Sequence, residues 1–401
     1  MKKIRVLFPY VEAGLGHIMP MRSIAETFEK KYGDRVEVVT SDFFTEGNDR
    51  HLIKYERMIS NQVRTYNRFP AIGHTANFFC DFFGATLSSF GAMALISPVA
   101  YKRGVAHMKE LAPDVVFSTH WVTNYYAEHL KNKPLTVMYC PDAVQNKLFE
   151  YHSDLNMISM PSGYRKALKK RKYTEDNMKM VPFLIRNGAF TVNADKKAAR
   201  RSLGLPEDNF TVLLAEGGYG IGKMEAMVKM LVAEHLPLTV ISVCGKNEKL
   251  YREFLSLEVS DEVTFRPYAL ADNMFELDAA SDVFCGKSGN ILAEATFFGD
   301  PTIVTNCSNM IERNIADHYI NTVGCAVKET SAKRAVALIK TFAADPSLLE
   351  PYRRAALAYH DNFGSGKAAD ELWRAIVGRF PEIEKNQRIE RVPESRNGKT
   401  L

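Results

Sequence analysis

Three loops of this 401-residue chain combine glycine with polar or ionisable side chains, which is the composition of a ligand-binding loop. In one of them, Gly217, four further residues, Gly222 and Lys223 match most of the phosphate-binding pattern G-x-x-x-x-G-K-[ST]. The next residue would need a hydroxyl group to hold Mg²⁺, but it is Met224, whose thioether is a poor ligand for that cation. The loop therefore argues against a nucleoside triphosphatase and favours a glycine turn that lines a cleft.

The second loop, "PYVEAGLGHIMP", follows the first apolar run of the chain. Its glycines, Gly16 among them, let backbone approach a ligand closely. The dinucleotide pattern G-x-G-x-x-G fails at Met19, although Asp42 could still bind a ribose, so a dinucleotide site stays an alternative. His17 could accept a proton near neutral pH, or it could simply cap the helix that follows.

The third loop, in "SDVFCGKSGNILAEATFFGDP", joins a strand to a helix through Lys287, Ser288, Gly289 and Asn290. The unpaired backbone N–H groups of a helix start form an anion site. Glu294 lies one turn further, where its carboxylate could hold two vicinal hydroxyls or merely complement the helix dipole.

Two series of short apolar runs, each run followed by a helical segment, predict the elements that carry these loops. The predicted strands are residues 4–9, 36–40, 115–118, 135–139 and 157–160, then 211–215, 238–243, 263–265, 282–285 and 302–305. Strand–helix alternation predicts an α/β fold of two doubly wound parallel-sheet domains that face a cleft. We place the domain boundary near residue 187, with domains at 1–187 and 188–380 and a polar tail at 381–401.

The composition is that of a soluble globular protein, with 46% hydrophobic and 25% charged residues. A formal charge of +5 is too small to indicate a nucleic-acid partner. The 6 cysteines show neither C-x-x-C nor zinc-like spacing, which favours free thiols in a cytoplasmic protein and no metal site. The N-terminus reads as a first strand and not as a signal peptide.

Two segments of the first domain bear on membranes. Residues 82–101 carry no charge, which fits a lipid-facing or acceptor-binding surface, a buried helix or a membrane span. Residues 164–173, "YRKALKKRKY", are rich in Lys and Arg. A basic run near an apolar segment predicts adhesion to an anionic membrane surface, although such a run can also be a solvated helix face.

The order of these motifs resembles a known family over residues 4–345. The stretches that carry the resemblance are "AGLGH", "EGGYGIGK", "VISVCGKNEKL", "VTFRPYALADNMFELDAASDVFCGKSGNILAEATFFGDPTIV" and "ERN". They resemble glycosyltransferases of the GT-B fold, in which two Rossmann-like domains face each other. Within that fold the chain resembles monogalactosyldiacylglycerol synthases and processive diacylglycerol glucosyltransferases, and more distantly the peptidoglycan N-acetylglucosaminyltransferase.

The resemblance implies a role for each matching position. It makes His17 the base and Asp142 a residue on the acceptor side that orients the acceptor or the base. The 1–187 domain would bind the acceptor and the 188–380 domain the donor. The implied donor-binding residues are Gly16, Gly218, Arg266, Tyr268, Lys287, Ser288, Gly289, Asn290, Glu294, Arg313 and Asn314. Among these, the Phe265–Tyr268 loop would hold uracil, the Ser288 region the diphosphate and Glu294 the ribose.

The implied activity is inverting transfer of a hexose from a UDP-sugar to a lipid such as diacylglycerol, without a metal or cofactor. The resemblance also implies a cytoplasmic protein that is peripheral on the inner face of the membrane. The chain departs from the family in three places. The spacing from Lys287 to Glu294 is short, Met310 and Ile311 stand where Gln-Glu is usual, and the His and Trp that follow Asp142 in relatives are missing. Sugar and acceptor therefore stay open. A UDP-N-acetylglucosamine 2-epimerase and a non-catalytic UDP-sugar-binding protein are the alternatives.

Overall fold

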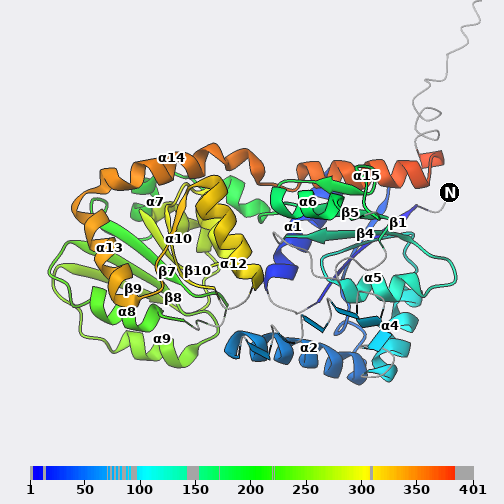
Figure 1. Ribbon diagram of the computed structural model, residues 1–401, viewed down its shortest axis with the longest axis horizontal. Coiled ribbons are helices and arrows are strands. Elements are labelled where there is room, and N and C mark those ends of the chain that lie inside the picture. The colour runs from blue at the N-terminus through cyan, green and yellow to red at the C-terminus, as the bar shows by residue number, and fades with distance from the viewer. Residues whose placement is uncertain are drawn as a thin grey trace, which may run out of the picture.

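The computed structural model describes residues 3–11, 15–69, 71–72, 75, 78–79, 82–83, 87–88, 90–91, 97–141, 153–170, 172–218, 220, 222–307 and 310–383. In this part of the chain, two six-stranded parallel sheets lie side by side, each with helices packed around it (Figure 1). The predicted α/β architecture of two doubly wound domains is confirmed.

The first sheet has the strand order β2-β1-β3-β4-β5-β6. Its strands are β1 (Arg5–Tyr10), β2 (Glu37–Asp42), β3 (Val115–Ser118), β4 (Leu135–Cys140), β5 (Leu155–Ile158) and β6 (Met178–Met180). Strands β3, β4 and β5 are buried along their whole length, which explains why their sequences are continuous apolar runs and not alternating ones.

The helices around this sheet include five from the first half of the chain. They are α1 (Leu15–Tyr32), α2 (Arg50–Arg68), α4 (Pro98–Leu111), α5 (Trp121–Glu128) and α6 (Pro161–Leu168). Asp49 starts α2, where its carboxylate accepts the backbone N–H groups of His51 and Leu52 at 2.8 and 3.3 Å. Gly104 lets α4 approach α5, because a Cβ atom at this position would lie 2.4 Å from the Tyr126 ring.

The second sheet has the order β12-β11-β10-β7-β8-β9. Its strands are β7 (Phe210–Ala215), β8 (Leu238–Val243), β9 (Val263–Tyr268), β10 (Val283–Lys287), β11 (Thr302–Asn306) and β12 (Ala326–Lys328). The α-helices that follow the linker are α7 (Lys196–Ser202), α8 (Met224–Leu231), α9 (Glu248–Leu255), α10 (Met274–Ala280), α11 (Asn290–Phe297), α12 (Met310–Asp317), α13 (Ala332–Ala344), α14 (Glu350–Ala358) and α15 (Gly366–Arg379). The chain order reverses between β7 and its neighbours β8 and β10, which is where such sheets bind ligands.

Helix α15 returns to the first sheet, although the predicted boundaries place it in the second domain. It runs along α1 at the first domain (Figure 1), and Trp373 stacks on Tyr32 with ring centroids 4.6 Å apart. Asp370 accepts hydrogen bonds from the Tyr32 hydroxyl at 2.7 Å and from Lys31. The apolar face of α15 therefore completes the core of the first domain, and a single cut near residue 187 does not separate the two cores.

The two connections between the domains are joined to each other. The backbone N–H of Phe183 donates to the Asn362 carbonyl at 2.8 Å, and the N–H of Gly364 donates to the Phe183 carbonyl at 2.9 Å. The linker after β6 and the crossing that leads to α15 are therefore hydrogen-bonded to each other, which restricts how the two sheets can move relative to each other.

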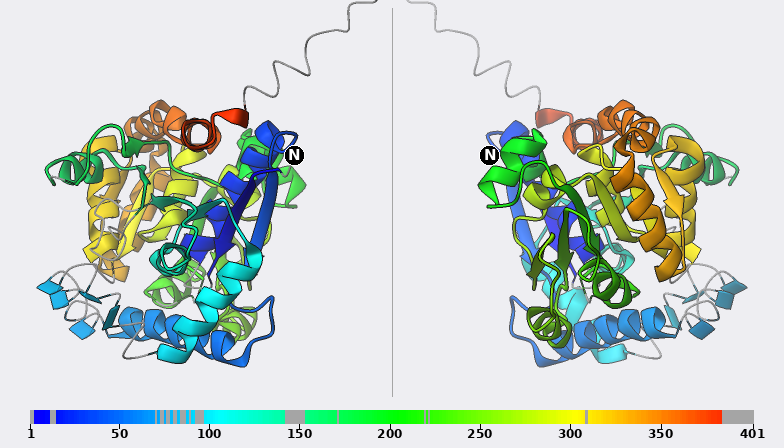
Figure 2. Two further views of the ribbon diagram at one scale, coloured as in Figure 1. Left: turned by 90° about the vertical axis from the view of Figure 1, so that its right-hand side faces the viewer. Right: turned by 90° about the vertical axis from the view of Figure 1, so that its left-hand side faces the viewer.

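An exposed apolar surface follows α2. Its described members expose at least 50% of their accessible area and are Phe69, Ile72, Phe78, Phe79, Phe82, Phe83, Leu87 and Phe90. We call this set the aromatic surface. The light-blue pieces that carry it lie at the periphery, beside α2 and away from both sheets (Figure 2). The alternative that residues 82–101 form a buried helix is therefore wrong for Phe82, Phe83, Leu87 and Phe90, whose side chains are exposed. No helix in the described part of the chain is long and apolar enough to cross a membrane.

The basic run 164–173 does not share a face with the aromatic surface. Its first half forms α6, which packs on β5 and β6, and Figure 1 shows α6 near α15 at the opposite end of the domain from α2. Arg165, Lys166 and Lys169 are exposed there. The fold therefore separates the basic run from the apolar segment, and the predicted joint membrane surface is not formed by residues 164–173.

Candidate functional site

The candidate base His17 lies in the first turn of α1 and is held by the end of β3. Its Nδ1 lies 2.8 Å from the Thr119 carbonyl oxygen, and the Thr119 hydroxyl donates to the His17 carbonyl at 2.9 Å. Because a carbonyl oxygen only accepts, this contact assigns the hydrogen to Nδ1 and leaves Nε2 as the proton acceptor of the neutral ring. Burial lowers the pKa of His17, and the bond to Thr119 offsets part of that effect. At neutral pH the ring is therefore in the form that a base requires.

A second imidazole, which sequence reasoning missed, lies next to the base. His120 is the N-cap residue of α5, where it accepts the backbone N–H of Val122 at 3.4 Å. Its ring centroid is 5.3 Å from that of His17, and the two rings are nearly perpendicular. Burial first, and then the proximity of His17, lower its pKa well below the ordinary value. The available signal was its position directly after strand 115–118. The other predicted catalytic residue, Asp142, lies outside the described residues.

The glycine loop after β7 folds around a buried carboxylate. Glu216 accepts the backbone N–H of Lys223 at 3.1 Å and the Thr305 hydroxyl at 2.9 Å. Burial raises the pKa of Glu216, while these two hydrogen bonds and Lys287 act in the opposite direction. A side chain at position 222 would displace the Glu216 carboxylate, because a Cβ atom there would lie 2.2 Å from its carboxyl carbon. In a P-loop the N–H at Lys223 would face phosphate, whereas here it is used by the protein.

The same loop packs backbone against backbone on the loop after β8. The Gly218 carbonyl accepts the N–H of Lys246 at 2.8 Å. Gly220 has φ +56°, and a Cβ atom there would lie 2.4 Å from the Cys244 carbonyl oxygen. The glycines therefore serve a close approach between two loops at the carboxyl ends of neighbouring strands. The geometry explains the glycines of this turn by its packing on the neighbouring loop, and its role in lining a cleft stays a prediction.

The start of α11 meets the loop of the base. The amide nitrogen of the Asn290 side chain donates to the Gly16 carbonyl at 3.3 Å, which joins the two domains beside His17. The Ser288 hydroxyl is buried and has no hydrogen-bond partner among the described residues. Gly289, with φ +147°, turns the chain into the helix. A helix start with a buried hydroxyl aimed at no protein group can bind an anion.

An ion pair closes one side of this helix start. The Lys287 ammonium lies 2.7 Å from the Glu312 carboxylate in the first turn of α12, and both side chains are mostly buried. Arg313, the next residue, is exposed, and Asn314 is partly buried on the same helix. The structure therefore gathers Lys287 and the α12 residues near one another, as predicted for a diphosphate-sugar site, although Lys287 is engaged by a carboxylate.

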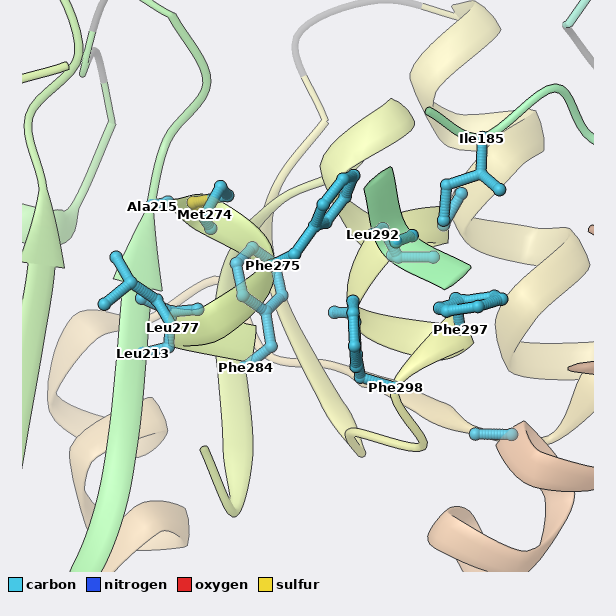
Figure 3. Close-up of a cluster of buried hydrophobic side chains, with 14 of the residues drawn as sticks. Ile185, Leu213, Ala215, Met274, Phe275, Leu277, Phe284, Leu292, Phe297 and Phe298 are labelled. Atoms are coloured by element: carbon cyan, nitrogen blue, oxygen red, sulfur yellow. The ribbon is translucent and has the colours of Figure 1, made fainter. Parts of the chain in front are cut away.

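Glu294 is held by an arginine of the interdomain linker. Arg186 contacts both carboxylate oxygens at 3.2 Å through Nε and an Nη, and its guanidinium lies 4.0 Å from the Phe275 ring centroid. Phe275 lies in the hydrophobic cluster between Leu213 of β7 and Leu292 of α11 (Figure 3). Burial raises the pKa of Glu294, and Arg186 opposes that rise. Sequence reasoning missed Arg186, since no local pattern links residues 108 positions apart.

A buried carboxyl pair lies close enough to Glu294 for their charges to interact. Asp278 has no hydrogen-bond partner on either oxygen, and Asp300 receives only one, from Lys196 at 3.1 Å, among the described side chains. Burial, Asp300 and Glu294 raise the pKa of Asp278 well above its ordinary value. Burial raises the pKa of Asp300 to about 7 despite Lys196. This pair gave no recognisable signal in the sequence.

The predicted uracil loop lies on the edge strand of the second sheet. Arg266 is exposed, and with Phe265 it lines a hollow of about 630 Å³ between α9 and β9. Tyr268 is partly buried against the core, and its carbonyl accepts the N–H of Cys244 at 2.9 Å. Lys287 ends β10, and Gly218 and Ser288 follow strand ends closely. Arg266 instead lies within β9, while Glu294 lies on α11 and Arg313 and Asn314 lie on α12.

Comparison with known proteins identifies relatives of low identity. No protein-family model matches the chain. It is 23% identical over 333 residues to monogalactosyldiacylglycerol synthase 1 of Arabidopsis thaliana, covering 76% of this chain and 58% of that protein. The corresponding Spinacia oleracea enzyme is 22% identical over 75% of this chain and 59% of its own length. The chain therefore spans less than two thirds of the length of these relatives.

Solved structures share the fold. The UDP complex of S. aureus MnaA superposes with a TM-score of 0.60 at 16% identity, covering 95% of this chain and 97% of the other. Acinetobacter baumannii MurG gives 0.57 at 12% identity, with 92% and 99% covered. Anabaena HepE in complex with UDP and glucose gives 0.56 at 14%, with 94% and 100% covered. The chain therefore has the GT-B fold and is similar to monogalactosyldiacylglycerol synthases over about three quarters of its length, in agreement with the resemblance of its motifs.

Proposed function

We propose that this protein is an inverting glycosyltransferase that moves a hexose from a UDP-sugar to a lipid acceptor such as diacylglycerol. The observation that carries the proposal is the contact between Asn290 and Gly16. It brings the start of α11, which can hold the donor diphosphate, against the loop of the candidate base His17. The similarity to monogalactosyldiacylglycerol synthases supports the same reaction class.

The proposed chemistry is a single displacement. An acceptor hydroxyl oxygen attacks the anomeric carbon while the bond from that carbon to the UDP oxygen breaks, and the hydroxyl proton passes to Nε2 of His17. Attack opposite to the leaving group inverts the anomeric centre. The N–H groups at the start of α11, the Ser288 hydroxyl and the Lys287 ammonium stabilise the charge on the departing UDP. As proposed, the reaction requires no metal.

The donor occupies the second domain in this proposal. Glu294 accepts the ribose hydroxyls, which requires that its carboxylate be shared with, or released by, Arg186. The Arg266–Tyr268 strand end holds uracil, the Gly218 loop borders the diphosphate, and Arg313 with Asn314 lie near the sugar. The Gly218 loop and the Ser288 region follow the ends of β7 and β10, where ligands of such sheets bind.

The aromatic surface is the proposed contact with lipid. Eight apolar side chains that are at least half exposed lie within one stretch of the chain, whereas exposed apolar residues on a soluble monomer are ordinarily scattered singly. The helices on either side of it in the chain carry exposed cations, Lys54 and Arg57 on α2 and Lys102 and Arg103 on α4. A basic residue near an anionic surface contributes about 1 kcal/mol of binding. These residues take the role that sequence analysis gave to the run 164–173.

The reaction is tested by measuring UDP release from UDP-glucose, UDP-galactose and UDP-N-acetylglucosamine, with and without diacylglycerol micelles and with or without EDTA. Products are identified by mass spectrometry. Lipid-dependent release from one donor, a hexosylated lipid and loss of turnover in His17→Asn with UDP binding retained are the expected results. Acceptor-independent epimerisation of UDP-N-acetylglucosamine would instead establish the epimerase, and donor binding without turnover on any extracted lipid would establish a binding protein.

The membrane contact is tested by sedimentation with vesicles that contain anionic lipid. Replacing Phe82 and Phe83 by Ser should reduce the bound fraction. The matched control replaces Leu255 and Leu357, which are 59% and 52% exposed on the second domain, by Ser. Equal recovery of the wild-type protein with and without vesicles at low ionic strength would refute the membrane contact.

A further inference from the structure

The turn between β3 and α5 touches the candidate base twice. Thr119 exchanges two hydrogen bonds with His17, one from the ring nitrogen and one to the backbone carbonyl. The next residue, His120, places its ring across that of His17 at a centroid distance of 5.3 Å. Two consecutive residues therefore fix the backbone and the ring of His17 from the same side.

This turn is itself rigid. The Thr123 hydroxyl donates to the His120 carbonyl at 3.0 Å and lies 2.7 Å from the Ser118 hydroxyl. Helix α5 is buried from Trp121 through Ala127, so its start cannot shift without disturbing the core. The His120 ring is held between this helix start and His17, and a contact made by so constrained a ring can hold its neighbour in one orientation.

The cap alone does not require histidine at position 120. Ser, Thr, Asp and Asn are the strongly preferred residues at a helix N-cap, because their short side chains reach the N–H groups of the first turn. The contact of His120 with the Val122 N–H is long, at 3.4 Å. An imidazole in this place is thus a weaker cap than the common alternatives, and its distinctive contact is the one with His17.

We propose that His120 is a positioning residue for the base: its ring packs across His17 and, together with Thr119, holds that imidazole in the orientation and tautomer that accept the proton of the acceptor hydroxyl. This inference rests on the proposed function. The Nδ1 of His120 accepts from the helix, so its hydrogen is on Nε2 and the ring is neutral.

A neutral ring has a chemical consequence for the base. A carboxylate at position 120 would stabilise the imidazolium form and raise the pKa of His17, so that more of the base would be protonated before the reaction. A neutral imidazole excludes water without adding that charge. His17 therefore stays unprotonated near neutral pH and releases its proton after transfer. The charge of a protonated His17 contributes to the lowered pKa of His120, so the two rings interact electrostatically as well as by packing.

Two substitutions separate the ring from the cap. His120→Asn keeps a good N-cap and removes the ring, whereas His120→Asp keeps the cap and adds a negative charge. The matched control is His129→Asn at the other end of α5, where the ring contacts the Tyr125 carbonyl at 2.7 Å. Thermal unfolding checks that each variant is folded.

The readout is the titration of His17, followed by NMR in protein with ¹³C-labelled histidine rings and assigned by its loss in His17→Asn. We expect the pKa of His17 to rise in His120→Asn, to rise further in His120→Asp, and to stay unchanged in His129→Asn. The acid limb of kcat/KM should move in the same direction, with kcat/KM at pH 7 lowered about 10- to 100-fold in His120→Asn while UDP affinity is retained.

The outcomes separate this inference from the proposed function. An unchanged His17 titration in both His120 variants, or an equal change in the His129 control, would overturn the positioning role even if the enzyme transfers hexose. A shifted titration in a protein without transferase activity would keep the coupling of the two rings and reject the reaction. If His120→Asn does not fold, His120→Ser gives the same comparison, because serine is also a good N-cap and removes the ring without adding charge.

Discussion

Replacing Asp300 by Asn should stabilise the protein at neutral and alkaline pH. Asp300 is fully buried, one of its oxygens has no partner among the described residues, and burial raises its pKa from 3.8 to about 7 in spite of Lys196. An acid whose folded pKa is above its unfolded value favours folding only when it is protonated. Its contribution is complete below pH 3.8, is lost as the pH rises toward 7, and stays lost above that.

The magnitude follows from the shift. Each pKa unit corresponds to about 1.4 kcal/mol, so ionising Asp300 costs the folded state about 4 kcal/mol at pH 8. The amide of Asn cannot ionise, can still accept from Lys196, and removes a negative charge that interacts with Asp278. We therefore expect the advantage of Asp300→Asn in the free energy of unfolding to be near zero around pH 4 and to grow until about pH 7.

The assay is thermal and urea unfolding of wild-type and Asp300→Asn protein between pH 4.5 and pH 8.5 at one ionic strength. The control is Asp208→Asn, since Asp208 pairs with Lys197, the neighbour of Lys196, at 2.7 Å but on the exposed surface. The control should show no such pH-dependent gain. A variant less stable than the wild type at pH 8 would show that the ionised Asp300–Lys196 pair stabilises the fold, and the reasoning from burial would fail.

Three further substitutions test the donor site. Gly222→Ala should destabilise the protein by about 1–3 kcal/mol and weaken UDP binding, because the new methyl group meets the Glu216 carboxylate at 2.2 Å. Adding Glu216→Ala should restore much of the lost stability. No recovery in the double variant would exclude this clash as the cause. Lys287→Met should weaken UDP binding by about tenfold and leave uridine binding unchanged in calorimetry. In the proposed site the lysine contacts the diphosphate and not the base. Equal losses of affinity for both ligands would contradict that placement. Glu294→Gln should weaken the binding of UDP and of uridine alike by about 10- to 100-fold, because the proposed site loses a charged acceptor for the ribose hydroxyls. An unchanged affinity for uridine would show that Glu294 does not bind the ribose.

The strands were predictable because they are buried on both faces. Residues 115–118 and 238–243 coincide with β3 and β8, and the other predicted strands overlap observed ones within a few residues. β6 and β12 were missed, since each has 3 residues and only its first is buried. So short an edge strand is set by its neighbour in the sheet and leaves no apolar run in the sequence.

The local chemistry of the site was also predictable, but its pairings were not. A glycine-rich turn after a strand and a polar helix start can both be recognised from a few consecutive residues. The partners of these groups come from far along the chain, as Gly16 does for Asn290 and Arg186 for Glu294, at separations of 274 and 108 residues. Nothing in a local pattern distinguishes Glu294 facing a ligand from Glu294 held by an arginine.

The sequence by itself determined that this protein has two parallel-sheet domains, where most of their strands lie to within a few residues, and which loops carry glycine, histidine and polar helix starts. These properties follow from local periodicity and from the conformational needs of single residues. Only the tertiary structure decided that α15 closes the first core, that the aromatic surface lies apart from the basic run on α6, that Glu216 fills the glycine loop, and that His120 stands beside His17. These are properties of packing, in which distant segments compete for the same space, so they exist only once the sheets have formed and faced each other.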